Sequence, residues 1–107
     1  FRDAFARGRR CLVPADGFYE WRAESGGAKR PYTVASRSGE PMALAGLGGW
    51  RGPGGEVLRS FTNVTCEANA KLRPLHDRMP IILPREAWPL WLGDDAVAGS
   101  EDLLALL

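Results

Sequence analysis

Short apolar runs, separated by turns that contain glycine, proline, aspartate or serine, recur along this sequence, and they constrain its fold most. Runs of this kind that are rich in Val, Phe, Tyr and Thr are typical of strands rather than helices. The pattern predicts about six short strands. The expected strands cover residues 11–13, 18–22, 31–36, 42–50, 57–66 and 79–83.

Helices are expected only as short segments. Apolar residues at helical spacing before Gly8 predict the end of an amphipathic helix. Pro84 is expected at the first position of another helix, which Gly93 ends. Further short helices are expected over residues 67–73, where the next proline stops the helix, and from Ser100 onward.

Three glycines in the run 42–50 predict a bend in that strand. Gly46, Gly48 and Gly49 would weaken a regular strand, so they indicate a close backbone approach or a barrel corner. Taken together, the elements predict an α+β fold with a curved, barrel-like, mainly antiparallel sheet and a few short helices. At 107 residues, a single domain over residues 1–107 is expected.

The composition is that of a globular protein, with 45% hydrophobic and 25% charged residues and a net charge of +1. No apolar stretch approaches the roughly 18 to 20 residues of a membrane-spanning helix, so no membrane partner is expected. The arginines of the first ten residues predict a solvated helix face or, alternatively, a nucleic-acid surface. They are Arg2, Arg7, Arg9 and Arg10.

Neither a metal nor a cofactor is expected. Cys11 and Cys66 are the only cysteines and do not form a CxxC pair, and there is one histidine and no phosphate-binding glycine loop. The sequence begins without Met in the middle of a helical pattern, so we expect it to lack an N-terminal segment.

His76 is the first candidate for chemistry. It lies in the segment Leu-His-Asp-Arg-Met-Pro, between an expected helix and a buried strand, where loop residues suit catalysis. Its imidazole can act as general acid or base, and Asp77 or Arg78 can bias its protonation. The alternative is a capping or surface histidine.

Glu20 is the second candidate, because aromatic residues flank it in Gly-Phe-Tyr-Glu-Trp. On a strand, Phe18, Glu20 and Arg22 share one face. A partly buried carboxylate beside aromatic rings could accept and return a proton near neutral pH. An exposed ion pair between Glu20 and Arg22 is the alternative.

Two further possibilities compete with this pair. Cys66 lies ten residues before His76, so a thiol–imidazole dyad is possible, although a cysteine in a β run is more often a small core residue. The tryptophans could include a stacking platform for unpaired bases, but Trp88 and Trp91 have the spacing of packing residues on a helix.

Four segments resemble the SRAP (SOS-response-associated peptidase) family in their order and spacing. They are RCLVPADGFYEW at residues 10–21, the segment 61–69 with its Thr-x-x-Ala-Asn ending, HDRMP at residues 76–80, and WPLWL at residues 88–92.

The resemblance implies an activity on damaged DNA. In the family, an N-terminal cysteine condenses its amine and thiol with the ring-opened aldehyde of an abasic site in single-stranded DNA, giving a thiazolidine crosslink. The resemblance assigns proton transfer to Glu20 and assigns sugar-ring opening and crosslink reversal to His76. It places Thr65 in the same pocket and implies DNA contacts for Arg78 and Trp21.

The 107 residues lack the family's leading Cys-Gly block and its Asn-Ala-Arg-Ser-Glu motif, so this fragment is expected to form no crosslink. Implied partners are single-stranded or abasic DNA, bound by a monomer in the bacterial cytoplasm and associated with the nucleoid when on DNA. Two alternatives remain open: a thiol peptidase that removes an N-terminal peptide, and a noncatalytic remnant that binds single-stranded DNA.

Overall fold

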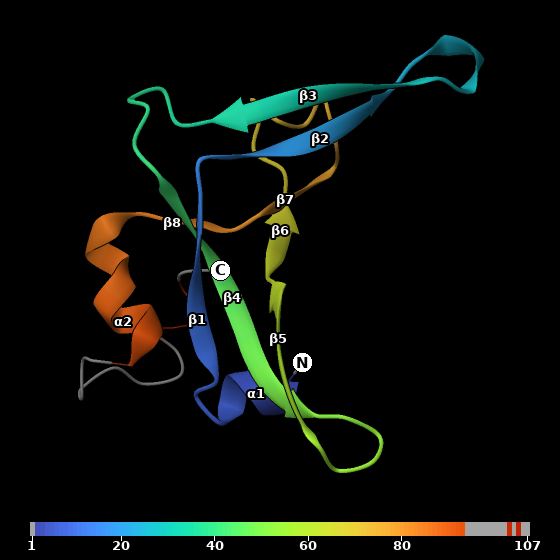
Figure 1. Cartoon of the computed structure of the whole chain (residues 1–107). Helices are drawn as coiled ribbons and strands as arrows, with labels where there is room; N and C mark the ends of the chain where they lie inside the picture. Colours follow the sequence, from blue (N-terminus) through green and yellow to red (C-terminus); the bar gives the residue numbers. More distant parts are fainter. Residues whose placement is uncertain (1, 94–102, 104, 106–107) are drawn as a thin grey trace.

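The computed structural model describes residues 2–93, 103 and 105 (Figure 1). Within them, eight strands, two short α-helices and two 3-10 helices follow one another along the chain. They are α1 (Arg2–Ala6), β1 (Arg10–Ala15), β2 (Gly17–Ala23), η1 (Ser25–Gly27), β3 (Lys29–Ala35), β4 (Met42–Arg51), β5 (Val57–Asn63), β6 (Thr65–Glu67), β7 (Arg78–Pro80), β8 (Ile82–Leu83), η2 (Arg85–Ala87) and α2 (Trp88–Leu92).

Strand β4 is the centre of the main sheet. It pairs antiparallel with β1, β5 and β8, and its residues 42–47 are buried. A side chain at Gly46 would place its Cβ 2.8 Å from Cys11 Sγ, so β1 packs this closely only against glycine. The register shifts between Gly48 and Trp50, where Gly49 has a φ of 73°, and the predicted bend is confirmed.

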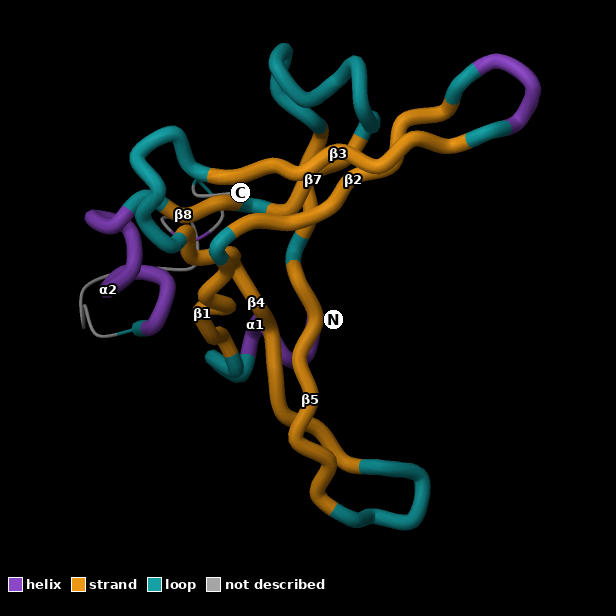
Figure 2. The backbone as a smooth tube through the Cα atoms, turned by 45° about the horizontal axis from the view of Figure 1, so that its top comes forward, coloured by secondary structure: helices purple, strands orange, loops and turns teal. Residues whose placement is uncertain are grey.

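The other strands form two separate two-stranded ribbons, β2–β3 and β6–β7. The β2–β3 hairpin extends away from the main sheet and carries η1 at its tip (Figures 1 and 2). The α+β class with mainly antiparallel strands is confirmed, but the expected closure toward a barrel is wrong for the described strands. The chain leaves the main sheet at Asp16, after which β2 pairs only with β3.

The core lies between the main sheet and the helices. Trp91 on α2 is fully buried, its Nε1 donates a hydrogen bond to the Cys11 carbonyl at 3.0 Å, and its ring lies 6.2 Å from that of Phe5. The buried cluster consists of Ala45, Leu47, Val64, Ile81, Leu83, Ala87, Trp91 and Leu103.

Two of the expected strands are each broken by one buried residue. Val64 divides the run 57–66 and Ile81 divides the run 79–83. The reason is a three-way junction of backbone hydrogen bonds, each of 2.9 Å: Val64 N–H donates to the Ala45 carbonyl, Ala45 N–H to Ile81, and Ile81 N–H to Val64. The junction joins the β6–β7 ribbon to the main sheet.

The expected helix over residues 67–73 is wrong. Glu67 pairs with Arg78 in the β6–β7 ribbon, and residues 70–75 form turns. The side-chain Oδ1 of Asn69 accepts hydrogen bonds from the N–H groups of Lys71 and Leu72, and the Arg73 N–H donates to the Asn69 carbonyl, so a capped turn forms here in place of a helix.

The expected helix over residues 84–93 forms as η2 and α2, and Gly93 ends it with a φ of 83°. Pro84 caps η2 in an extended conformation instead of occupying its first position. The helix expected from Ser100 lies outside the described residues, apart from Leu103, which is buried, and Ala105, which is exposed. No helix in the described part of the chain is long and apolar enough to cross a bilayer.

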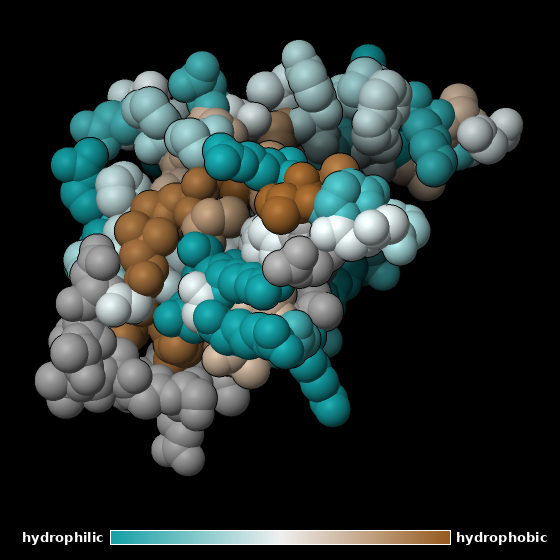
Figure 3. Space-filling model, turned by 60° about the horizontal axis from the view of Figure 1, so that its bottom comes forward, coloured by the Kyte–Doolittle hydropathy of each residue, from teal (hydrophilic) through white to brown (hydrophobic). Residues whose placement is uncertain are grey.

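Strand β5 lies at the edge of the main sheet and leaves large apolar side chains exposed, among them Val57, Leu58 and Phe61. On the face seen in Figure 3, hydrophobic side chains gather in small groups between hydrophilic ones and form no continuous apolar surface.

Candidate functional site

The β6–β7 ribbon fixes the positions of Thr65 and Arg78. Arg78 Nη2 donates to the Thr65 carbonyl at 2.9 Å and to Thr65 Oγ1 at 3.0 Å. Both residues are exposed, and only one terminal nitrogen of the guanidinium is engaged within the described residues. The remaining N–H groups of Arg78 are therefore available to a phosphate or another acceptor.

His76 precedes β7, at the end of the turns that follow Asn69. Its Nδ1 lies 3.1 Å from the Arg78 backbone nitrogen and 3.2 Å from the Arg78 carbonyl oxygen, so Nδ1 accepts from the N–H in one tautomer and donates to the carbonyl in the other. Asp77 Oδ1 lies 3.3 Å from the same nitrogen and can accept from it when the ring is protonated. The ring is partly exposed and can exchange a proton with a ligand through Nε2.

Glu20 lies on the more covered face of β2. Burial alternates along the strand, with Phe18 and Glu20 half-buried and Tyr19 and Trp21 exposed, as the sequence predicted for these faces. Across the ribbon, Glu20 pairs with Tyr32 of β3. Within residues 2–93, no ion pair joins Glu20 to Arg22, so the alternative of a solvent-exposed pair is not supported.

The opposite face of the β2–β3 hairpin is aromatic and open. The Trp21 side chain is 52% exposed and that of Tyr19 is 73% exposed, and both point to the same side of the strand. Their partners across the ribbon are Pro31 and Thr33. This face has the flat, accessible rings on which unpaired bases can stack.

Two ribbons therefore contribute the predicted residues. Hydrogen bonds connect Thr65, Arg78 and His76, whereas Glu20 and Trp21 belong to the hairpin. The loop between β6 and β7 lies beside the hairpin in both views of the backbone (Figures 1 and 2). No hydrogen bond or ion pair crosses between these two groups in the part of the chain that the structure describes.

The whole sequence matches one family model, that of the SOS response associated peptidase (SRAP), over residues 1–107. The chain belongs to the SRAP family. The resemblance seen in its four segments is thus confirmed.

Two curated relatives of this SRAP chain are both named abasic site processing proteins. It is 39% identical to the abasic site processing protein YoqW of Bacillus subtilis over 78% of this chain and 38% of the relative. It is 34% identical to the abasic site processing protein HMCES of Mus musculus, over 96% of this chain and 37% of the relative. The chain thus spans less than two fifths of the length of these relatives.

Solved structures show the same SRAP fold. A crystal structure of a Bordetella bronchiseptica protein superposes with a TM-score of 0.83 at 34% identity, covering 100% of this chain and 53% of that one. A Bacteroides thetaiotaomicron protein gives a TM-score of 0.79 at 29% identity, over 92% of this chain and 44% of that one.

The two cysteines of this SRAP chain are packing residues. Cys66 packs against the core cluster, and within the described residues it makes no contact of a catalytic dyad with His76. Burial raises the pKa of the Cys11 thiol, which disfavours the thiolate. The described residues also contain no cluster of three or more side chains that could hold a metal ion.

The sequence did not point to Arg30 and Tyr32, which line an open hollow with Arg22 near the tip of the hairpin. A second hollow, at the base of the hairpin, is lined by Asp16, Gly17, Phe18, Tyr19 and Thr33. The register of the hairpin creates both hollows. In the sequence, only the length of the turn between β2 and β3 could have indicated which residues of the two strands pair.

Proposed function

We propose that this SRAP chain acts on abasic sites in DNA, with Glu20 and His76 as its proton-transfer groups. The observation that carries the proposal is its 34–39% identity to relatives named abasic site processing proteins. The proposal makes DNA the partner and places the protein in the cytoplasm, on the nucleoid when bound.

The chemistry that the family resemblance implies needs groups that move protons near a sugar. When an amine attacks the aldehyde of a ring-opened abasic site, water leaves as the imine forms, and addition of the thiol then closes a thiazolidine. A half-buried Glu20 can take a proton from the attacking amine. Nε2–H of His76 can donate to the sugar oxygen as the ring opens.

Thr65, Arg78 and Trp21 are assigned to DNA binding. Arg78 has free donors for a phosphate, and Thr65 holds the guanidinium in place. Trp21, with its exposed ring, stacks on an unpaired base, which favours single-stranded over duplex DNA. We propose that the protein binds as a monomer.

The amine and thiol nucleophile belongs to an N-terminal Cys-Gly block that these 107 residues do not contain, and Cys11 and Cys66 are partly buried within strands β1 and β6. These residues alone should therefore give no covalent product. A thiol peptidase is less well supported, because neither cysteine contacts His76 in the described part of the chain.

The direct test is a version of the chain restored with the upstream segment that begins Cys-Gly. Incubation with single-stranded DNA that carries one abasic site should give a covalent species of reduced mobility on a denaturing gel. Undamaged DNA and a Cys→Ser change of the restored N-terminal residue are the controls, and both should give none.

Experiments with the restored protein also distinguish the proposal from the thiol peptidase and from the noncatalytic remnant. If it gives no covalent species with abasic DNA, the proposal fails. Release of an N-terminal peptide without DNA would favour the peptidase, and salt-sensitive binding with no covalent product would favour the noncatalytic remnant.

A further inference from the structure

The outer half of the β2–β3 hairpin carries two arginines directly opposite each other. Arg22 on β2 is in register with Arg30 on β3, and residues paired in this way point to the same face of the ribbon. Like charges in this arrangement destabilise a pair of strands. Folding of the hairpin therefore gives no reason for two cations here.

The protein neutralises this pair only in part. Glu24 Oε1 lies 3.9 Å from Arg30 Nη1, and both side chains are exposed, so the contact is weak. Within residues 2–93, the side chains of Arg22 and Tyr32 make no hydrogen bond or ion pair. Their donor groups remain available to a ligand.

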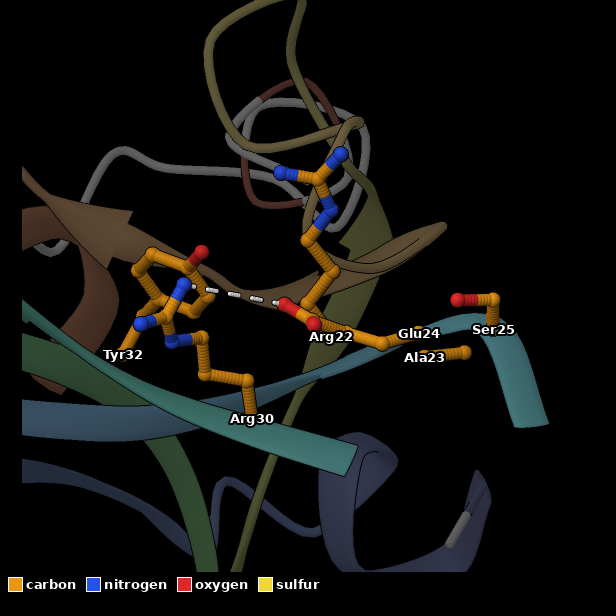
Figure 4. A pocket seen from close by; sticks show the side chains of 6 residues that line it. All are labelled: Arg22, Ala23, Glu24, Ser25, Arg30 and Tyr32. Atoms are coloured by element: carbon orange, nitrogen blue, oxygen red, sulfur yellow. Dashed lines mark ion pairs between the residues drawn. The ribbon is translucent and has the colours of Figure 1, made fainter. Parts of the chain in front are cut away.

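An open hollow of about 330 Å³ lies among these side chains. In Figure 4 the Arg30 guanidinium lies beside the Tyr32 ring, with the Glu24 carboxylate directed at it, and the Arg22 side chain extends upward on the other side. Guanidinium groups present planar, forked N–H donors that match the oxygens of a phosphate. The hydroxyl groups of Tyr32 and Ser25 add further donors at the rim.

The hollow adjoins the position of Glu20. Arg22 follows Glu20 by two residues on the same face of β2, a separation of about 6.6 Å along a strand. Tyr32 lies directly opposite Glu20 on β3 and also lines the hollow, so the two places share this residue. A phosphate in the hollow would therefore belong to a nucleotide next to the one at Glu20.

We propose that the Arg22–Arg30 pair binds a phosphodiester group of single-stranded DNA, one nucleotide away from the sugar at Glu20. This inference rests on the proposed function, because DNA supplies the phosphate. The bound anion relieves the repulsion between the two arginines and aligns the strand along the hairpin. The hairpin then binds the DNA on both faces, through stacking on one and through a phosphate on the other.

The test removes the two charges and keeps similar side-chain shapes, with Arg22→Gln and Arg30→Gln combined in the chain. Arg37→Gln combined with Arg59→Gln is the matched control, because these arginines are also exposed and have no side-chain partner within the described residues. Binding of a fluorescent, undamaged single-stranded oligonucleotide is measured by anisotropy over a range of KCl concentrations.

The hairpin variant should bind about tenfold more weakly at low salt, and the slope of log K against log salt should fall by about 0.7 for the lost phosphate contact. The control should keep the slope of the unaltered chain. Arg22→Lys with Arg30→Lys should keep the slope but lose part of the affinity, because lysine lacks the forked donors.

Two outcomes overturn the phosphate site and leave the proposed function standing: DNA binding that the hairpin variant does not change, and equal losses in the hairpin and control variants. Failure of the unaltered chain to bind the oligonucleotide at all overturns both ideas. The hairpin variant should melt at the same temperature or higher, because a repulsion has been removed. A lower affinity can then be attributed to the missing contact.

Discussion

The Nδ1 atom of His76 lies 3.1 Å from the Arg78 backbone nitrogen and 3.3 Å from Asp77 Oδ1, so Nε2 is the ring nitrogen left to face a ligand. Glu20 has no ion pair within the described residues, so its carboxylate is available for proton transfer. At the scale of single residues, the two candidate proton-transfer groups therefore differ: Nδ1 of His76 has several polar neighbours on the loop, whereas the Glu20 carboxylate has only a 3.4 Å contact with the Trp21 backbone nitrogen.

Replacing either proton-transfer group should slow crosslinking without abolishing DNA binding. In the restored protein, Glu20→Gln and His76→Ala should each reduce the rate with abasic single-stranded DNA by about 10²-fold, the usual effect of losing a general acid or base. The measurement is a time course on denaturing gels, with anisotropy as the binding control. Unchanged rates of formation and reversal in both variants would remove these residues from the mechanism.

Thr65 and Arg78 should have separable effects on DNA binding. Arg78→Gln removes a phosphate partner, so the salt slope should fall by about 0.7. Thr65→Val removes only the 3.0 Å contact that positions Arg78, so affinity should fall a few-fold at an unchanged slope. Thr62→Val, an exposed change on the edge strand β5, is the control and should do neither. Identical slopes in all three variants would contradict the role of Arg78.

Between elements, one arginine ties both helices to the main sheet. Arg10 on β1 donates from Nε to the Trp91 carbonyl at 2.6 Å and from Nη1 to the Phe5 carbonyl at 3.3 Å, and its guanidinium lies 5.9 Å from the Phe5 ring centre. An arginine from the basic start of the chain, which the sequence placed on a solvated face or a DNA surface, thus has a structural role.

Arg10→Ala should lower the free energy of unfolding by about 1–3 kcal/mol, since a charged donor is lost from two helix carbonyls. Arg59→Ala, an exposed change without a side-chain partner in the described residues, should alter it by less than about 0.5 kcal/mol. Urea denaturation of both variants provides the comparison. Equal stabilities would mean that Arg10 is a surface residue after all.

The contact between β1 and β4 depends on the missing side chain of Gly46. Gly46→Ala would place its Cβ 2.8 Å from Cys11 Sγ and 2.9 Å from Val13 Cγ2, so it should cost about 1–3 kcal/mol. Gly54→Ala meets only the flexible end of Glu56 and should cost little. Adding Cys11→Ala should restore part of the lost stability, and a failure to do so would place the strain elsewhere.

At the scale of the whole molecule, the hairpin is separate from the core. The radius of gyration is 15.9 Å, whereas a compact chain of this length would have about 13 Å. None of the buried cluster residues lies on β2 or β3. The DNA contacts that we propose for the hairpin thus lie outside the buried core.

Shortening the tip of the hairpin should weaken DNA binding and leave the stability of the fold unchanged. Ala23 and Lys29 are paired, so Asn-Gly can replace residues 24–28 as a two-residue turn. The unfolding free energy should change by less than about 0.5 kcal/mol, while DNA affinity falls because the rim of the hollow is lost. A large loss of stability would show that the tip supports the core.

Local patterns were enough to predict where most strand residues lie, the helix ending at Gly93 and the bend at Gly49, because turn residues and glycine act within a few positions. The sequence also predicted the faces of β2, since alternation is a property of the strand itself. Its four family segments led to the correct family.

Contacts between distant segments decided the rest. The hydrogen bonds among Ala45, Val64 and Ile81 break two expected strands, and the pairing of Glu67 with Arg78 takes the start of an expected helix into a ribbon. The register of the hairpin places Arg22 opposite Arg30, and the two ribbons form sheets separate from the main sheet instead of closing a barrel.

The sequence determined which residues form most of the strands and which residues are candidates for the chemistry. Only the tertiary structure decided which of them meet, because such pairings depend on long-range hydrogen bonds that no local pattern specifies.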